Sequence, residues 1–339
     1  MKPRAFVGLD VHRNLVVATA LDPTGKRIRQ KSFGPTSKEL VGFLRRLPKP
    51  TKVVLESCLV WERFYEAAIS SGAEVVVSHP RTTRMIAEAS LKTDKVDSAT
   101  LANLLRLNAV PTVFVQSPED RARKHLFSDH QFLVGIRTRL MEHAYSRIGR
   151  LGIDYAPGQL QRRTTREKLR KLHNLEIDHA LDALNDLDAR CQHLEERLHE
   201  EYLRSRPAQL LTTIPGIGEV TAVGIASNLN PIERFHSAER LTSYAGLCPT
   251  THQSSGTSYH GPLKPDCSRK LRKLLVQVSW RHRIHEPKGD VAKLAKRVGK
   301  RKGRMHGTVV GAHKLLRIIY AMLKQDRPYQ LRAPESAVA

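Results

Sequence analysis

The chain is short of acidic residues: Asp and Glu total 33 against 57 Lys and Arg, which gives its 339 residues a formal net charge of +24. An excess of this size is rare in a metabolic enzyme and attracts polyanions, of which nucleic acid is the commonest large one. A membrane surface is the alternative polyanion. The sequence has no apolar run of the roughly 18 to 20 residues that a membrane helix needs, so we expect no membrane-spanning segment.

The sequence also lacks the features of a zinc site, of a disulfide framework and of a secreted protein. The four cysteines are far apart and form no C-x-x-C pair, which argues against a zinc site or a disulfide framework. His282 and His285 lie three residues apart with no second ligand pair nearby, so we expect them to contact solvent or phosphate. The basic N-terminus lacks the long apolar run and the cleavage site of a signal peptide. These features predict a cytoplasmic protein with reduced thiols.

The first part of the chain alternates between strand-like and helix-like patterns. We expect strands at Ala5–Asp10, Leu15–Leu21, Arg27–Phe33, Lys52–Leu55 and Glu74–Ser78, and helices at Lys38–Leu47 and Glu62–Ser70. Three strands in a meander followed by strand–helix alternation describe a mixed α/β sheet. The length and the 40% apolar content allow two domains, or three with a helical linker, and we place the first at residues 1–120.

Residues 121–206 have a helical pattern and form the expected arm. Apolar residues recur there at spacings of three and four, namely Leu184, Leu187, Cys191, Leu194 and Leu198. This coiled-coil-like stripe either packs within its own domain or forms a dimerising arm.

A third domain is expected at residues 207–330, followed by a tail at 331–339. Its segment from Pro262 to His306 contains 15 Lys and Arg against three acids, Asp266, Glu286 and Asp290. A charge run is usually a solvated face, but one this one-sided favours a nucleic-acid surface.

Four carboxylates of the first domain have positions that suit a metal site. Asp10 and Glu56 each close an apolar strand, and Asp94 and Asp97 lie three residues apart at the start of an expected helix, on one helical face. Hard divalent ions such as Mg²⁺ take oxygen ligands, and a pair of them about 4 Å apart can clamp a phosphodiester. Spacing alone leaves a second interpretation open, in which these acids end strands or cap a helix.

The segment 210–222 places Pro-Gly-Ile-Gly between apolar helical stretches and predicts a helix-hairpin-helix turn. Gly216 and Gly218 allow a tight loop whose N–H groups, with the next helix N-terminus, can hold a phosphate. Such a contact binds the DNA backbone without reading sequence. A plain turn between two helices is the alternative.

A loop of two serines and a glycine, Ser254–Gly256, precedes a strongly basic expected helix. Alone, this loop predicts only flexibility. Beside a basic helix, a serine could attack a phosphodiester while cations neutralise the pentavalent transition state. The basic residues of that helix that we expect to contact nucleic acid are Arg269, Lys270, Arg272 and Lys273.

These motifs together resemble the DEDD-type transposases of bacterial insertion sequences, the group related to the Piv and MooV DNA invertases. The resemblance covers roughly residues 4–115 and 208–325. It rests on five ordered motifs, at Gly8–His12, Leu55–Ser57, Lys92–Ala99, Ile214–Gly218 and Gly246–Gly256.

The resemblance implies a RuvC-like, ribonuclease-H-type α/β first domain, a helical arm and a mostly α C-terminal domain with a helix-hairpin-helix. It implies that Asp10, Glu56, Asp94 and Asp97 hold Mg²⁺. The serine immediately before Gly256 matches the family motif best, so Ser255, rather than Ser254, would attack DNA and form a covalent phosphoserine link. The implied partners are donor and target DNA, a noncoding bridge RNA that guides them, and further copies of the chain in a dimer or tetramer.

The sequence departs from the family pattern after the serine loop. The family has a basic stretch with a glycine there, whereas this chain reads Gly261–Ser268, with Lys264 in the place of the motif lysine and no matching glycine. Two other functions remain open. A Holliday-junction-type endonuclease would use the same four acids with water as nucleophile and would not need Ser255. A noncatalytic nucleic-acid-binding regulator would not need the acids at all.

Overall fold

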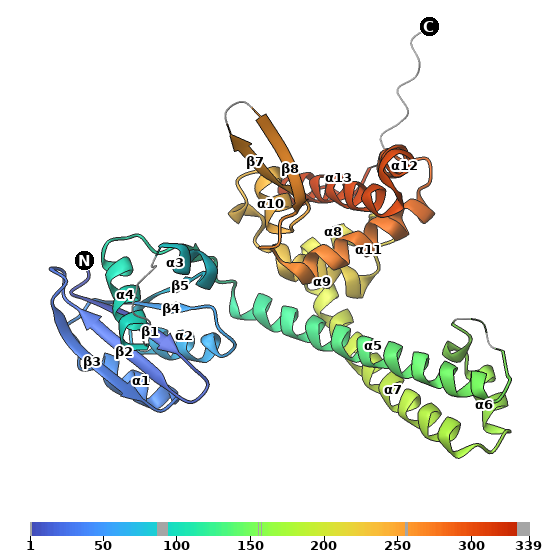
Figure 1. The fold of residues 1–339 in the computed structure, drawn as a ribbon, viewed down its shortest axis with the longest axis horizontal. Coiled ribbons are helices and arrows are strands. Elements are labelled where there is room, and N and C mark those ends of the chain that lie inside the picture. The colour runs from blue at the N-terminus through green and yellow to red at the C-terminus, as the bar shows by residue number, and fades with distance from the viewer. Residues whose placement is uncertain (1, 87–93, 155, 157, 255–256, 331–339) are drawn as a thin grey trace, which may run out of the picture. The chain divides into compact units, whose positions relative to one another are not determined.

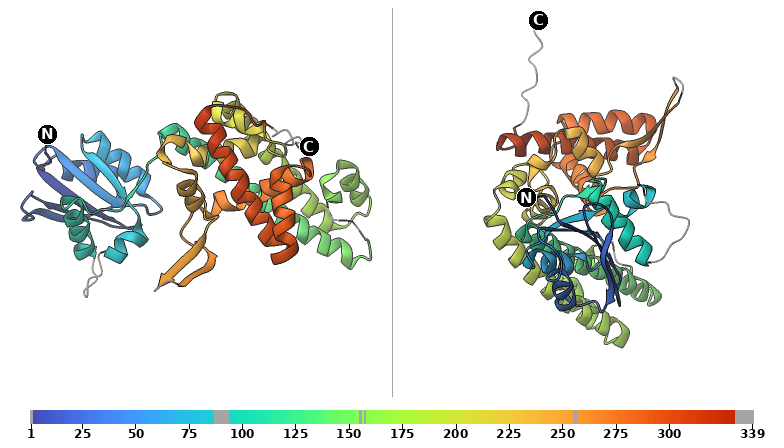
Figure 2. Two further views of the ribbon diagram at one scale, coloured as in Figure 1. Left: turned by 90° about the horizontal axis from the view of Figure 1, so that it is seen from above. Right: turned by 90° about the vertical axis from the view of Figure 1, so that its left-hand side faces the viewer.

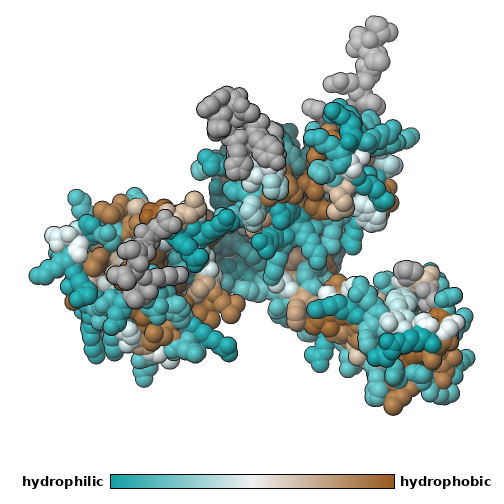
Figure 3. Space-filling model, in the orientation of Figure 1, coloured by the Kyte–Doolittle hydropathy of each residue, from teal (hydrophilic) through white to brown (hydrophobic). Residues whose placement is uncertain are grey.

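The computed structural model describes residues 2–86, 94–154, 156, 158–254 and 257–330, with the backbone alone for those between 251 and 260. The chain forms two compact units, Met1–Val115 and Gln116–Ala339, coloured blue to teal and green to red in Figure 1. No helix in the described part of the chain is both long and apolar enough to span a membrane. Hydrophilic residues cover much of the visible surface of both units (Figure 3).

The first unit is built on a six-stranded sheet in the order β3-β2-β1-β4-β5-β6. Its strands are β1 (Ala5–Val11), β2 (Val16–Leu21), β3 (Arg27–Phe33), β4 (Thr51–Glu56), β5 (Glu74–Ser78) and β6 (Thr112–Val113). Strands β1, β4 and β5 are parallel, while β2 and β3 form an antiparallel meander with β1, and β6 is antiparallel to β5. The mixed α/β sheet expected from the sequence is confirmed.

Helices cover both faces of this sheet, as Figures 1 and 2 show. The helices of this unit are α1 (Ser37–Leu44), α2 (Trp61–Ser70), α3 (Pro80–Ile86) and α4 (Asp94–Arg106), of which α1, α2 and α4 contribute buried residues to the cores on the sheet. Val7, Leu9 and Leu55 pack in the cluster that contains the buried residues of α1 and α2. Val54, the neighbour of Leu55, packs instead with Leu101 of α4. Because side chains alternate between the faces of a strand, α4 lies on the face opposite to α1 and α2.

Gly8 allows α4 to lie directly against β1. A Cβ atom at Gly8 would come within 2.1 Å of the Ser98 carbonyl oxygen and 2.5 Å of the Ala102 nitrogen. The buried hydroxyls of Thr19 in β2 and Ser98 in α4 are 2.8 Å apart. Gln30 of β3 donates to the Lys95 carbonyl at 3.2 Å. These contacts fix the first turns of α4 on the sheet.

The second unit begins with two long helices, α5 (Pro118–Arg150) and α7 (Leu175–Leu203), joined through η1 (Gln159–Gln161) and α6 (Arg163–Arg170). Leu184 of α7 is buried with Met141, Ala144 and Ile148 of α5. Ion pairs bridge the two helices farther along, such as that between Arg123 Nε and Glu201 Oε2 at 2.7 Å. The apolar stripe of α7 therefore packs within its own chain, the first of the two arrangements expected for it.

The rest of the second unit is a helical body carrying one β-hairpin (Figure 1). Its elements are α8 (Arg206–Thr212), α9 (Glu219–Leu229), η2 (Ile232–Arg234), α10 (Ala238–Tyr244), β7 (Pro249–Ser254), β8 (Thr257–Leu263), α11 (Arg269–His285), α12 (Asp290–Lys302) and α13 (Arg304–Gln325). Buried side chains from α8, α9, α11 and α13 share one core. The sequence led us to expect a mostly helical C-terminal region, and the β7–β8 hairpin is an addition to it.

Candidate metal site and nucleic-acid-binding elements

Two of the four predicted acids lie at the carboxyl ends of neighbouring parallel strands. In the register of β1 and β4, Leu9 is opposite Leu55, so Asp10 and Glu56 are the next residues along the two strands. Strand alternation places both on the face that α4 covers, because Leu9 and Leu55 point to the other face. Adjacent strands are about 4.8 Å apart, so the two carboxylates share one edge of the sheet.

The other two acids lie at the start of the helix on that same face. Asp94 is the first residue of α4 and Asp97 follows in its first turn. Negative charge is favourable at a helix N-terminus, because the unpaired N–H groups and the helix dipole make that end positive. The side chain of Asp94 is 50% exposed, whereas that of Asp10 is only 17% exposed.

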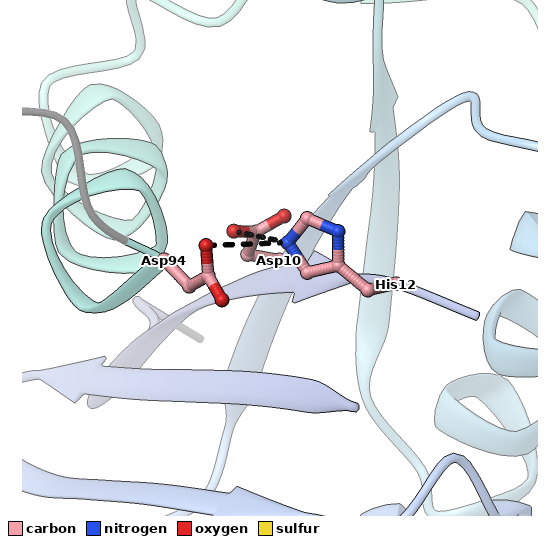
Figure 4. A group of neighbouring side chains, drawn as sticks. All are labelled: Asp10, His12 and Asp94. Atoms are coloured by element: carbon pink, nitrogen blue, oxygen red, sulfur yellow. Dashed lines mark hydrogen bonds and ion pairs between the residues drawn. The ribbon is translucent and has the colours of Figure 1, made fainter. Parts of the chain in front are cut away.

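A histidine joins this group. His12 lies two residues beyond Asp10, and its Nε2 atom is 3.1 Å from Asp10 Oδ2 and 3.5 Å from Asp94 Oδ1 (Figure 4). The side chain of His12 points between the two carboxylates from the strand end, while Asp94 approaches from α4. The imidazole therefore links the sheet edge with the helix start.

The electrostatics of the site show that it gathers negative charge. Partial burial raises the pKa of Asp10 above its ordinary value, and His12 opposes that rise through its hydrogen bond and charge. The negative charges of Asp94 and Asp97 raise the pKa of Asp10 further. Such mutual repulsion between carboxylates is relieved when a cation binds among them.

The donor atoms fit a divalent cation in number and spacing. Among the described residues, ligand atoms of Asp10, His12 and Asp94 all lie within 4.8 Å of one another. In an octahedral site with ligands about 2.1 Å from the ion, neighbouring ligand atoms are about 3 Å apart. The separations of 3.1 and 3.5 Å from His12 to the two carboxylates are close to that value. Glu56 and Asp97 are not in this closest group, although they share its face of the sheet.

The serine loop connects the two strands of the β7–β8 hairpin. Ser254 ends β7 and pairs with Thr257 at the start of β8. Ser255, the predicted nucleophile, and Gly256 lie between them, outside the described residues. The base of the hairpin is tied to α11, because Arg272 Nη1 donates to the carbonyls of Gly246 at 3.3 Å and Lys264 at 3.1 Å.

The predicted helix-hairpin-helix corresponds to α8, a short turn and α9. Gly216 has a φ of +90°, and a Cβ atom there would come within 2.9 Å of the His282 backbone nitrogen in α11. The expectation that His282 contacts solvent or phosphate is wrong, because its side chain is buried and forms a 2.9 Å hydrogen bond between Nδ1 and the Pro215 carbonyl. Gly218, by contrast, caps the N-terminus of α9, and a Cβ atom there would meet no other described atom within 4 Å. Gly216 thus serves packing against α11, and the space at Gly218 is open.

The basic residues chosen from the sequence differ in whether their cationic groups already have a hydrogen-bond partner in the protein. Lys264 Nζ donates to Ser243 Oγ at 3.3 Å, and Lys270 Nζ donates to Ser128 Oγ at 2.7 Å. Arg269 and Lys273 are exposed, and neither has an ion pair with another described residue. Together with the hairpin-binding role of Arg272, this leaves Arg269 and Lys273 as the members of the set with free cationic groups.

Comparison with known proteins supports a common ancestry over both units. Residues 7–146 match a family model for DEDD transposases of the IS110 type, and residues 208–293 match one described as the IS116/IS110/IS902 transposase family. The chain is 30% identical over 291 residues to the pilin gene-inverting protein of Moraxella bovis, covering 81% of this chain and 80% of that protein. The chain belongs to the IS116/IS110/IS902 family of transposases.

Other relatives cover almost the whole length of this transposase. It is 24% identical to the transposase for insertion sequence element IS1328 of Yersinia enterocolitica, over 94% of this chain and 97% of that one. It is 22% identical to the transposase for IS1111A of Coxiella burnetii, over 98% and 93%. Transposition and gene inversion both require DNA to be cut and rejoined, so this transposase is a DNA-cleaving and DNA-joining enzyme.

Sequence reasoning missed one member of the candidate site of this transposase. His12 was part of a recognised motif but was given no role of its own. The signal was the spacing of two between Asp10 and His12, which places both side chains on one face of an extended segment. Divalent metal use follows from the DEDD-type domain and from this donor group.

Proposed function

We propose that the transposase excises and inserts an insertion sequence by Mg²⁺-dependent DNA strand exchange. The observation that carries this proposal is the convergence of Asp10, His12 and Asp94 at the edge of the sheet, in a chain of the DEDD transposase family. The strand order β3-β2-β1-β4-β5 with one antiparallel meander supports a ribonuclease-H-type, RuvC-like fold for this unit.

Asp10, Glu56, Asp94 and Asp97 would hold the Mg²⁺ ions, with His12 beside them. When bound, these ions supply positive charge that neutralises the phosphodiester in its transition state. The protein's own part is to fix the carboxylates at the strand ends and the start of α4, so that little reorganisation is needed when charge develops. The burial of Asp10 favours this role, because electrostatic interactions are stronger away from water.

Ser255 is the proposed nucleophile. Its Oγ would attack the phosphorus, form a phosphoserine ester and lose its proton, while the displaced deoxyribose hydroxyl takes up a proton. A hydroxyl of the partner strand would then attack the phosphoserine and lose its proton, which restores a phosphodiester, while the displaced Ser255 Oγ takes up a proton. The bond energy is kept through both steps, so no external energy source is required. The pairing of Ser254 with Thr257 supports this role, because it brings the two ends of the loop together.

A noncoding bridge RNA is the proposed guide that pairs with donor and target DNA. The active form is proposed to contain two or four copies of the chain. The formal charge of +24 supports binding of both nucleic acids. Gly218 supports a backbone contact with phosphate, because it leaves the N-terminus of α9 open.

The proposal is tested by strand exchange between donor and target DNA in the presence of the element's RNA. We expect Asp10→Asn to reduce product by at least about 100-fold, since loss of one carboxylate loosens the ions, while DNA binding stays nearly unchanged. Asp186→Asn, which alters an exposed acid of α7 in the other unit, is the matched control and should keep full activity. A wild-type amount of strand-exchange product in the presence of EDTA, or with the Asp10→Asn protein, would refute the metal site.

A further inference from the structure

A dense group of basic residues in the second unit lies on α12, within the basic segment Pro262–His306 but beyond the individual residues chosen from it, and almost wholly beyond the region matched by the second family domain, which ends at residue 293. Between residues 293 and 304 the chain has seven Lys and Arg and no acid. The exposed basic side chains are Lys293, Lys296, Arg297, Lys300, Arg301, Lys302 and Arg304. None forms an ion pair with another described residue.

Five of these residues share one face of α12. At 100° per residue, Lys293, Lys296, Arg297, Lys300 and Arg301 fall within an arc of about 140° and extend over about 12 Å of the helix axis. We call these five side chains the α12 basic face.

The opposite side of α12 is held firmly by α13. Val291, Ala292 and Ala295 are buried there. A Cβ atom at Gly307 of α13 would lie 2.3 Å from the Ala295 carbonyl oxygen and 3.0 Å from Gly299 Cα, so the two helix backbones are in close contact. The α12 basic face is therefore presented outward by a tightly packed helical hairpin.

We propose that the α12 basic face binds the phosphate backbone of duplex DNA, which deepens the proposed function and rests on it. Five cations over about 12 Å correspond to one charge per about 2.4 Å, comparable with the one phosphate per about 1.7 Å of axis in a DNA duplex. The major groove of B-DNA, which is about 12 Å wide, admits an α-helix.

The chemistry of α12 favours duplex DNA over RNA. Single-stranded RNA is recognised largely by stacking of its bases on aromatic side chains, and α12 contains no aromatic residue. The major groove of duplex RNA is too deep and narrow for side chains to read. Because it offers only cations, the α12 basic face binds the phosphate backbone of DNA without reading its sequence. The choice of target is left to other parts of the complex.

The test is the salt dependence of binding by the full chain to a labelled DNA duplex and, in parallel, to a labelled RNA duplex, measured by fluorescence anisotropy in EDTA so that no strand is cut. One variant replaces Lys293, Lys296, Arg297, Lys300 and Arg301 with Gln. The control removes the same charge from exposed residues of the α5–α7 region, by replacing Arg150, Arg162, Lys168, Lys171 and Arg190 with Gln. Thermal unfolding verifies that both variants are folded.

Contact with three or four phosphates should make the slope of log K against log salt shallower by about 3 in the α12 variant, since each phosphate contributes about 0.9. The control should keep a slope close to that of wild type. The proposal is overturned by an unchanged slope in the α12 variant, by an equal change in the control, or by a change seen with duplex RNA only. Wild-type protein that shows no salt-dependent DNA binding would overturn the proposed function as well.

Discussion

At the scale of single residues, His12 connects local sequence to chemistry. An Asp and a His two positions apart at a strand end project to the same side, and α4 brings Asp94 to meet them. The result is one nitrogen donor among carboxylates. Oxygen ligands suit Mg²⁺, whereas an imidazole nitrogen adds affinity for later transition metals such as Ni²⁺.

Replacing His12 should therefore change which metal the site prefers. We expect His12→Ala to lower the affinity for Ni²⁺ by about tenfold or more, equivalent to about 1.4 kcal/mol, and to lower that for Mg²⁺ much less. Isothermal titration calorimetry with each ion measures both values. His193→Ala removes an exposed histidine of α7 and serves as the control. An unchanged affinity for Ni²⁺ would show that His12 does not act as a ligand.

At the scale of secondary structure, the sequence predicted the elements that carry a clear hydrophobic pattern. Strands β1, β2, β4 and β5 are apolar runs, and α1 begins after Thr36, whose side chain caps the helix by accepting a hydrogen bond from the Glu39 N–H. The β7–β8 hairpin was missed because Thr250–Ser258 is a polar segment without strand-like alternation. The role of Arg272 could not be predicted either, since it depends on carbonyls that only the folded chain brings together.

The close approach of β1 and α4 predicts the effect of adding one methyl group. Gly8→Ala places a Cβ atom 2.1 Å from the Ser98 carbonyl, so α4 must move away from the strand and carry Asp94 with it. We expect a loss of about 1–3 kcal/mol in the free energy of unfolding, together with weaker metal binding. A Cβ atom at Gly42 in α1 would meet no other described atom within 4 Å. Gly42→Ala should therefore be neutral or raise the free energy of unfolding by up to about 1 kcal/mol. Denaturant unfolding that gives the same result for both variants would contradict this packing.

The two glycines of the α8–α9 turn should separate stability from binding. Gly216→Ala forces a side chain to a φ of +90° and against α11, so we expect a loss of at least about 1–2 kcal/mol in stability. Gly218→Ala should leave the melting temperature nearly unchanged but weaken DNA binding, because its Cβ would occupy the space where a phosphate approaches α9. Thermal unfolding and anisotropy measure the two effects, and unchanged DNA affinity in Gly218→Ala would remove the turn from the binding surface.

At the scale of the whole molecule, the chain distributes its functions between two units. The acids belong to Met1–Val115, whereas the serine hairpin and the α12 basic face belong to Gln116–Ala339. The family to which the chain belongs shows that it cuts and joins DNA. A serine nucleophile distinguishes strand exchange through a protein–DNA ester from hydrolysis by a metal-activated water, because hydrolysis leaves no covalent intermediate.

The most direct test of this mechanism is a denaturing gel of the protein after incubation with labelled donor and target DNA, the element's RNA and Mg²⁺. We expect a protein–DNA adduct with the wild type and none with Ser255→Ala, which should still bind DNA and metal normally because the change removes only the attacking hydroxyl. Ser254→Ala is the neighbouring control and should form the adduct. An adduct in Ser255→Ala would contradict the assignment of the nucleophile, and cut DNA without any adduct in the wild type would instead support hydrolysis by water.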